Sequence, residues 1–167
     1  MASNIDTCYL LRSLATSKVA SSFLELGTGT GLSTAFILDG IDANSTLVSI
    51  DNDAVCLDIA RRNLAKDTRL ELIEIDGVEW FANNRYKMFD YIFADTWYGK
   101  YLQLEETLRM VNIGGFYIID DMLPQANWPE GHDKKVTALI ADLKSRLNFS
   151  IVEMNWASGI IIATRKY

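Results

Sequence analysis

Short apolar runs alternate along this chain with longer amphipathic segments. The apolar runs predict strands near residues 21–26, 46–51, 69–75, 89–95, 115–120, 148–155 and 159–164. The amphipathic segments predict helices near residues 4–18, 31–39, 53–65, 76–84, 99–112 and 132–147. The last helix is the clearest, because its apolar residues form one stripe: Val136, Leu139, Ile140, Leu143 and Leu147. Regular alternation of strands and helices predicts an α/β fold, with a mostly parallel sheet covered by helices on both faces.

The end of the chain departs from this alternation. Only Trp156, Ala157 and Ser158 separate the last two predicted strands. Three residues are too few for the crossover that parallel strands require, so this pair is predicted to be an antiparallel hairpin. A length of 167 residues suits one domain, which we expect to span residues 1–167. No apolar run reaches membrane-spanning length, so we expect no membrane association.

A glycine-rich turn follows the first predicted strand. Residues 23–31 read Phe-Leu-Glu-Leu-Gly-Thr-Gly-Thr-Gly, and an amphipathic segment begins directly afterwards. Such a turn lets a ligand approach backbone amides that a Cβ would obstruct. The second strand ends at Asp51, whose carboxylate can lie beside this turn and accept hydrogen bonds from ribose hydroxyls. Leu32 breaks both the G-x-G-x-x-G dinucleotide fingerprint and the phosphate loop, which needs a lysine at that position.

Acidic residues follow each of the first five predicted strands, where an open α/β sheet binds its ligands. They lie in five segments: Glu25 to Gly31, Asp51 to Asp53, Asp76-Gly77, Asp95 to Tyr98, and Asp120-Asp121. Asp53 and Asp76 have the alternative role of capping the helices that follow them. Acids at all five ends exceed what capping requires, and they favour a ligand that carries positive charge.

The E-x-G-x-G-x-G turn with its distal acid resembles the first two motifs of class I S-adenosylmethionine-dependent methyltransferases. The resemblance implies a Rossmann-like, doubly wound, seven-stranded sheet of order 3-2-1-4-5-7-6, with a C-terminal antiparallel hairpin and an N-terminal helix. It also implies S-adenosyl-L-methionine (SAM) as the cofactor. The positions that match its binding residues are Glu25, Gly27, Thr28, Gly29, Gly31, Ser33, Asp51, Asn52, Asp76, Gly77 and Asp95.

The turn after the fourth strand indicates a branch of that superfamily. It reads Asp-Thr-Trp-Tyr and lacks the prolines typical of enzymes that methylate adenine or cytosine amino groups. It resembles instead the catechol O-methyltransferase branch, in which three strand-end side chains hold a Mg²⁺ ion. The matching positions are Asp95, Asp120 and Asp121, and carboxylates suit such a hard cation. In the alternative, Asp95 contacts only the cofactor and Asp120 caps a turn.

The catalytic candidates on this resemblance are Asp95 and Lys100. The branch places a general-base lysine three residues after the strand-four acid, where this chain has Tyr98. Lys100 lies two residues further along, at a predicted helix start, about 200° round the helix axis, so we expect it to point elsewhere. We expect His132 to be a surface residue at the start of the last helix, with a catalytic role as the alternative.

Aromatic residues near these strand ends are the candidates for an acceptor pocket. We expect Trp97, Tyr98 and Trp128 to roof a flat, apolar substrate site, although Trp128 has the alternative of packing its loop against the protein.

Charge and cysteine usage suggest the kind of partner. The net charge is −6, the pI is near 4.7 and basic residues are scattered, which makes a nucleic acid an unlikely partner and favours a small-molecule acceptor. Cys8 and Cys56 lack metal or redox spacing, and we expect buried free thiols in a reducing, cytoplasmic setting. A homodimer that helps to close the pocket is a further expectation.

The predicted function is SAM-dependent O-methylation of a small hydroxylated acceptor of aromatic type, with Mg²⁺ assisting. The alternatives are an RNA or protein methyltransferase on the same scaffold, a non-catalytic SAM-binding protein, and an aminopropyl transferase.

Overall fold

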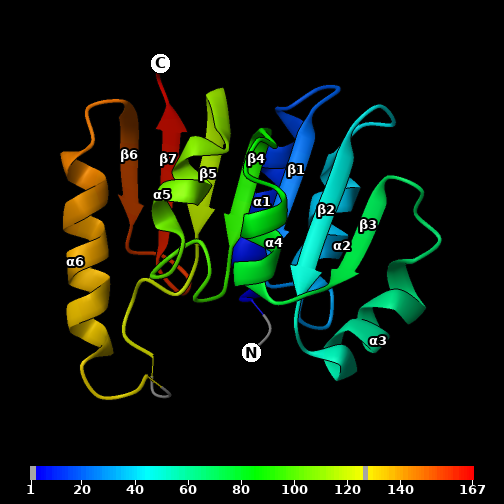
Figure 1. Ribbon diagram of the computed structural model, residues 1–167, viewed down its shortest axis with the longest axis horizontal. Helices are drawn as coiled ribbons and strands as arrows, with labels where there is room; N and C mark the ends of the chain where they lie inside the picture. The colour runs from blue at the N-terminus through cyan, green and yellow to red at the C-terminus, as the bar shows by residue number, and fades with distance from the viewer. Residues whose placement is uncertain (1–2, 126–127) are drawn as a thin grey trace.

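The computed structural model describes residues 3–125 and 128–167, and its strands form one twisted sheet (Figure 1). Their order is β3-β2-β1-β4-β5-β7-β6, which confirms the predicted topology. β1 to β5 run parallel, whereas β7 is antiparallel to both of its neighbours. The strand bounds are β1 Ser22–Leu26, β2 Thr46–Asp51, β3 Leu70–Glu74, β4 Phe89–Ala94, β5 Val111–Ile119, β6 Phe149–Met154 and β7 Ile160–Arg165.

Helices cover both faces of the sheet. Their bounds are α1 Ile5–Thr16, α2 Leu32–Gly40, α3 Ala54–Leu64, α4 Gly77–Asn83, α5 Leu104–Arg109 and α6 His132–Ser145. Leu11 of α1 and Ile37 of α2 belong to one apolar core, while Trp80, Leu108 and Leu139 bring α4, α5 and α6 into another. Figure 1 shows α4 in front of the sheet and α1 and α2 behind it. Because strand side chains alternate between faces, each central strand contributes to both cores.

The segment between β4 and β5 differs from the sequence prediction. The predicted helix 99–112 is wrong in extent, because only Leu104–Arg109 is helical and β5 begins at Val111. Gly99 has a φ of +85° and Gln103 a φ of +54°, and these left-handed conformations interrupt a helix. A Cβ at Gly99 would lie 2.5 Å from the Leu26 Cδ1 atom, so this turn depends on glycine. Residues 97–103 therefore form compact turns whose side-chain directions do not follow helical phase.

The carboxyl ends of β1, β2, β4 and β5 lie at one edge of the sheet, at the bottom of Figure 1, close to the N-terminus. Two strand-end acids cap the helices that follow. The Asp53 carboxylate accepts hydrogen bonds from the backbone N–H of Val55 (2.9 Å) and Cys56, and Asp76 accepts one from Val78 (2.8 Å). The same edge brings together the strand ends and loops that carry the acids predicted for the site.

Two further expectations concern membranes and thiols. Within residues 3–125 and 128–167, no helix combines the length and the apolar character that crossing a membrane requires. Cys8 and Cys56 are both free. Cys8 is buried as expected, but Cys56 is only partly buried, because it lies in the exposed first turn of α3.

Candidate active site

The turn between β1 and α2 has the backbone geometry that its glycines permit. Gly27, Gly29 and Gly31 all have positive φ, at 102°, 52° and 89°. A Cβ at Gly27 would lie 3.2 Å from the Asp95 carbonyl oxygen, and one at Gly31 would lie 2.8 Å from Leu64 Cδ1. The first glycine thus allows the turn to approach the end of β4, and the third allows it to pack on α3.

A cavity of about 250 Å³ opens above this turn. Its lining includes Thr28, Ser33, Asp51, Asp95 and the turn glycines Gly27 and Gly29. Asp51 also supports the turn, because its Oδ2 accepts a hydrogen bond from the Gly29 backbone N–H at 2.7 Å. Six residues that the sequence nominated for cofactor binding therefore surround one space.

Glu25 lies beneath the turn rather than in this cavity. Its carboxylate is fully buried and accepts hydrogen bonds from the hydroxyls of Ser33, Thr34 and Ser49, each at 2.5 Å. Burial raises the pKa of Glu25 to about 7, although the three hydroxyl donors act in the opposite direction. Glu25 therefore supports the cavity by holding Ser33 in its wall.

Asp76 and Gly77, which the sequence nominated for cofactor binding, contact an unexpected aromatic ring. Tyr98 donates a hydrogen bond to Asp76 Oδ2 at 2.7 Å, and a Cβ added to Gly77 would meet its ring at 2.3 Å. Tyr98 and Gly77 line a small cavity of about 30 Å³ with Asn52. The expectation that Tyr98 joins Trp97 over the acceptor is wrong, because its side chain turns toward α4.

Three carboxylates from two strand ends converge beside the larger cavity. Asp95, Asp120 and Asp121 each offer an oxygen, and these oxygens lie within 4.8 Å of one another. Burial raises the pKa of Asp95 to about 6, with Lys100 lowering it and the two neighbouring carboxylates raising it further. Burial also raises the pKa of Asp120. Asp121 has a left-handed φ of 59°, which lets consecutive residues turn their side chains toward the same point.

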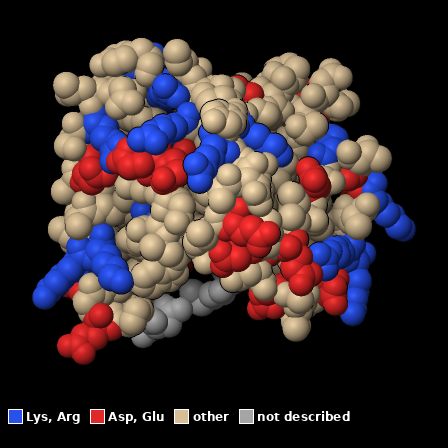
Figure 2. All heavy atoms as spheres, in the orientation of Figure 1, with Lys and Arg blue, Asp and Glu red and all other residues tan. Residues whose placement is uncertain are grey.

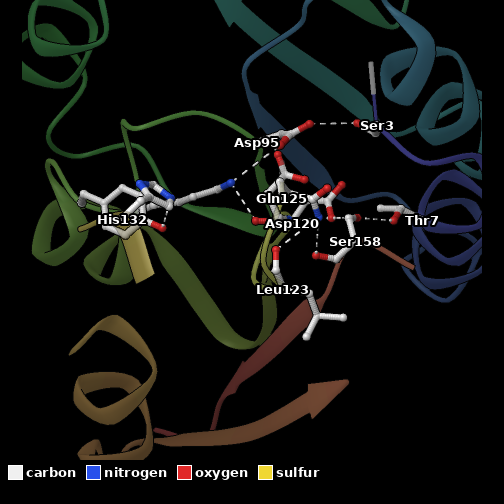
Figure 3. A network of polar contacts seen from close by, with 11 residues as sticks. Ser3, Thr7, Asp95, Asp120, Leu123, Gln125, His132 and Ser158 are labelled. Atoms are coloured by element: carbon white, nitrogen blue, oxygen red, sulfur yellow. Dashed lines mark hydrogen bonds and ion pairs between the residues drawn. The ribbon is translucent and has the colours of Figure 1, made fainter. Parts of the chain in front are cut away.

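Hydroxyl groups from distant parts of the chain hold this acidic cluster (Figure 3). The Ser3 hydroxyl donates to Asp95 Oδ2 at 2.9 Å. Ser158, in the turn between β6 and β7, donates to Asp120 Oδ1 and lies 3.3 Å from the hydroxyl oxygen of Thr7 in α1. The Asp121 backbone N–H donates to the same Asp120 oxygen at 2.7 Å. Asp120 Oδ1 thus accepts two hydrogen bonds, one from Ser158 and one from the Asp121 backbone.

Asp120 Oδ2, in contrast, is buried and has no hydrogen-bond partner among the described residues. A buried carboxylate oxygen without a donor is costly unless a cation or a proton satisfies it. Together with the convergence of oxygen ligands from Asp95 and Asp121, this orphaned atom fits a hard divalent cation.

Lys100 points into the acidic cluster. The expectation that it points elsewhere is wrong, because residues 97–103 are turns instead of the start of a helix. Its Nζ donates to the Asp120 backbone carbonyl at 2.7 Å and lies 3.6 Å from Asp95 Oδ1. Only 6% of its side chain is exposed, so its charge partly offsets the repulsion among the carboxylates with little screening by water.

An aromatic cavity of about 190 Å³ adjoins the acidic cluster. Asp95, Asp121 and Lys100 line it together with rings that pack edge-to-face or tilted against one another. These rings belong to Trp97, Tyr101, Trp128 and His132. The sequence placed Trp97 and Trp128 here but gave no signal for Tyr101.

His132 is buried, which corrects the expectation of a surface residue. Its ring lies against Trp97, Tyr101 and Trp128, and its Nε2 is 3.2 Å from the Tyr101 hydroxyl. Burial lowers the pKa of His132, and the nearby charges of Lys100 and Lys135 lower it further. The neutral imidazole is therefore favoured, and it serves as a wall of the cavity with one nitrogen committed to Tyr101.

The cavity above the glycine turn and the aromatic cavity meet at the end of β4. Asp95 and Thr96 line both spaces. A ligand in the first cavity and a ligand in the second would therefore approach each other beside Asp95. This arrangement suits transfer of a group between two bound molecules.

Comparison with known proteins places this geometry in a family. A family model described as a methyltransferase domain matches residues 24–122. No curated protein gives a sequence match to the chain.

Solved structures share the fold over almost the whole chain. An O-methyltransferase from Bacillus cereus in complex with SAH is 20% identical, with a TM-score of 0.83, and the match covers 99% of this chain and 83% of that one. An O-methyltransferase from Streptomyces achromogenes involved in tomaymycin synthesis, in complex with SAM, is 17% identical with a TM-score of 0.84, covering 99% and 82%. A methyltransferase from Geobacter sulfurreducens is 22% identical with a TM-score of 0.78, covering 97% and 79%.

Proposed function

Because this chain belongs to the methyltransferase-domain family, we propose that it is a SAM-dependent O-methyltransferase that acts on a small hydroxylated acceptor of aromatic type. The observation that carries the proposal is the shared wall of the two cavities. Asp95 and Thr96 separate the glycine-turn cavity from the aromatic cavity, which contains the carboxylates of Asp95 and Asp121. The structural neighbours crystallised with SAM and SAH support the choice of cofactor.

The cofactor is proposed to occupy the glycine-turn cavity. Its sulfonium carries positive charge, which suits the carboxylates of Asp51 and Asp95 at the rim. Asp51 would accept hydrogen bonds from the ribose hydroxyls, and Ser33 would face the amino-acid end. Asn52, Asp76 and Gly77 would lie at the adenine end, where the Tyr98 hydroxyl already occupies one Asp76 oxygen.

A Mg²⁺ ion is proposed to be held by Asp95, Asp120 and Asp121. Bound there, it would supply Lewis-acid chemistry that lowers the pKa of an acceptor hydroxyl. The residues that surround the cluster would keep its carboxylates in place: Ser158 on one oxygen of Asp120 and Lys100 between the two strand ends.

In the proposed reaction the acceptor oxygen attacks the methyl carbon of SAM as the carbon–sulfur bond breaks. The products are the methyl ether, S-adenosylhomocysteine and the proton of the acceptor hydroxyl. The chain contributes mainly by alignment, because holding two reactants at near-attack distance removes most of the entropic cost of their encounter. Asp95 and Lys100 are the proposed catalytic residues, since Asp95 lines both cavities and Lys100 lies 3.6 Å from it in the wall of the aromatic cavity.

The proposed partners and setting follow from the surface and the thiols. Lys and Arg side chains on the face seen in Figure 2 lie in small groups among Asp and Glu, which favours a small-molecule acceptor over a nucleic acid on that face. We also propose a reducing, cytoplasmic setting, which the free state of Cys8 and Cys56 supports. A homodimer that helps to close the acceptor pocket is a separate proposal. Sedimentation equilibrium tests the homodimer.

A methyl-transfer assay tests the proposed function. The purified protein is incubated with catechol, Mg²⁺ and SAM carrying a labelled methyl group, and labelled methyl ether is expected. Treatment with EDTA is expected to abolish transfer and added Mg²⁺ to restore it. Asp121→Asn is expected to retain part of the activity, because an amide oxygen can still act as a ligand. Full activity in EDTA would contradict the metal, and no transfer to any hydroxylated acceptor would contradict the O-methyltransferase assignment.

A further inference from the structure

A second, more apolar space adjoins the aromatic cavity and lies along α6. We propose that the acceptor is an elongated molecule, a hydroxylated ring bearing an apolar chain, whose ring lies at the acidic cluster and whose chain runs into this space. The inference rests on the proposed function, because it specifies which acceptors that site prefers. It is carried by the sizes of the two spaces, by their linings and by the wall that they share.

The aromatic cavity alone has the size of a small ring and is small for an acceptor that carries a longer substituent. Its volume is about 190 Å³, whereas pockets that enclose small-molecule ligands usually hold about 300–1,000 Å³. Its polar groups gather at the inner end, where Asp95, Asp121 and Lys100 meet. A hydroxylated ring therefore has a place for its oxygens here, but a longer acceptor must extend beyond this cavity.

The adjoining space, which we call the α6 groove, provides that extension. It has a volume of about 440 Å³ and lies between α6 and the segment that leads into α5. Its apolar walls come from Leu102, Leu104, Ala138 and Leu139. Trp97, Lys100 and Tyr101 line both the groove and the aromatic cavity, so the two spaces share a wall and lie side by side.

Exposed apolar side chains at the groove also need an explanation. Trp97 and Leu102 leave 42% and 44% of their surfaces in water. Single exposed apolar residues are ordinary, but two that flank an apolar groove mark a ligand-binding surface. The Lys135 ammonium lies 4.4 Å from the centre of the Trp97 ring and covers one face of the indole, so it forms part of the rim.

The occupant indicated by these features is part of the acceptor. The groove adjoins the cavity that contains the reacting centre, and it adds aliphatic side chains where that cavity has the carboxylates of Asp95 and Asp121. In an acceptor of this kind, the hydroxyls of the ring would face the carboxylates of the cavity, and a chain of a few carbons would lie against the aliphatic side chains of the groove.

A pair of acceptors and two variants test the inference. Catechol and 4-butylcatechol present the same hydroxyls, but only the second carries a chain for the groove. Ala138→Trp fills the groove from an exposed position on α6. Thr137→Trp adds the same ring one residue away, about 100° round the helix, and Thr137 does not line the groove.

For the unmodified protein, kcat/KM is expected to be at least tenfold higher for 4-butylcatechol, because each buried methylene contributes roughly fourfold in affinity. Ala138→Trp is expected to raise KM for 4-butylcatechol about tenfold and to leave KM and kcat for catechol within about twofold. Thr137→Trp is expected to match the unmodified protein with both acceptors. Equal preference for the two acceptors, or an Ala138→Trp effect of the same size on both, would overturn the inference.

Two further outcomes separate this inference from the proposed function. If neither acceptor is methylated, the proposed function fails, and calorimetry with 4-butylcatechol in the presence of S-adenosylhomocysteine and Mg²⁺ still tests the groove. Binding that Ala138→Trp weakens and Thr137→Trp does not would support it, whereas no binding would overturn it. A stable dimer that Ala138→Trp dissociates would assign the groove to a second copy of the chain and also overturn it.

Discussion

At the scale of single residues, burial divides the acids of the site into two groups. Asp76 is exposed and Asp51 is partly buried at the end of β2, and both accept hydrogen bonds from backbone N–H groups. Glu25, Asp95 and Asp120 are buried, and burial raises the pKa of each. The sequence could place an acid at each strand end, but not its depth, because depth depends on which other segments cover it.

Glu25→Gln tests the buried carboxyl beneath the glycine turn. The pKa of Glu25 is about 7 in the folded protein, against 4.5 without burial. The unfolded chain therefore loses this proton first, and the contribution of Glu25 to stability is complete below about pH 4.5 and lost as the pH rises through about 7. Relative to Glu25→Gln, the free energy of unfolding of the unmodified protein is expected to fall by about 2–4 kcal/mol over this range.

Urea unfolding at pH 4.5 and pH 8 measures this difference, with Glu71→Gln on the exposed side of β3 as the control. The control is expected to follow the unmodified protein at both pH values. A constant difference between the unmodified protein and Glu25→Gln would show that Glu25 has the same pKa in both states.

Lys100→Met tests the cation between Asp95 and Asp120. Removing the ammonium leaves the buried Asp95 carboxylate without its counter-charge and leaves the Asp120 carbonyl without its donor. We expect kcat to fall by roughly 10²-fold or more, the usual scale for removal of a fixed charged or hydrogen-bonding group beside the reacting centre. Steady-state kinetics measures kcat, and SAM affinity by calorimetry is expected to change little. A fall in kcat of less than tenfold would exclude Lys100 from catalysis.

At the scale of helices and strands, the hydrophobic pattern of the sequence predicted correctly the features that depend on local interactions. The antiparallel hairpin followed from the three residues between β6 and β7, because a crossover needs a longer connection. The helix expected at 99–112 was wrong because Gly99 and Gln103 adopt left-handed conformations, and the backbone of Gly99 packs closely against Leu26. Such conformations are set by tertiary contacts, which periodicity does not report.

The same distinction holds for the site. The acids at the ends of β4 and β5 could be nominated from the sequence, because parallel strands present their carboxyl ends at one edge of the sheet. The hydroxyl groups that hydrogen-bond to these acids could not be predicted from the sequence. Thr7 and Ser158 are 151 positions apart, and they meet only because α1 packs beside the β6–β7 turn.

Ser158→Ala tests this support. The Ser158 hydroxyl fixes Asp120 Oδ1 and leaves Oδ2 free for an ion. Because partners of a metal ligand typically account for 10–100-fold in metal affinity, the dissociation constant for Mn²⁺ is expected to rise about tenfold. Electron paramagnetic resonance of Mn²⁺, used in place of Mg²⁺, measures this without turnover. Ser150→Ala on the exposed side of β6 is the control, and unchanged affinity in Ser158→Ala would contradict the positioning role.

At the scale of the whole molecule, the topology creates the place where the two cavities meet. The chain leaves β1 toward β2 and β3 on one side, and β4 and β5 lie on the other. Connections that diverge in this way leave a crevice at the carboxyl ends of the two central strands. The glycine turn fills one side of that crevice and the aromatic cavity the other, with Asp95 at the end of β4 facing both. Two ligands held there would stabilise both halves of the sheet together.

Thermal unfolding with and without SAM measures that stabilisation. A ligand present at 100 times its dissociation constant stabilises a protein by about 2.7 kcal/mol, which is about 5–10 °C in Tm for a chain of this size. Asp51→Ala removes a rim carboxylate and the acceptor of the Gly29 N–H, so at the same SAM concentration its shift is expected to be half or less of that value.

Asp39→Ala, at an exposed position on α2 remote from the cavity lining, is expected to keep the full shift. NADH is expected to give a smaller shift than SAM at equal concentration, because Leu32 breaks the dinucleotide fingerprint in the glycine turn. Absence of a shift with SAM, or a larger one with NADH, would contradict the proposed cofactor. Equal losses in Asp51→Ala and Asp39→Ala would show that the shift reports general stability of the sheet rather than occupation of the cavity.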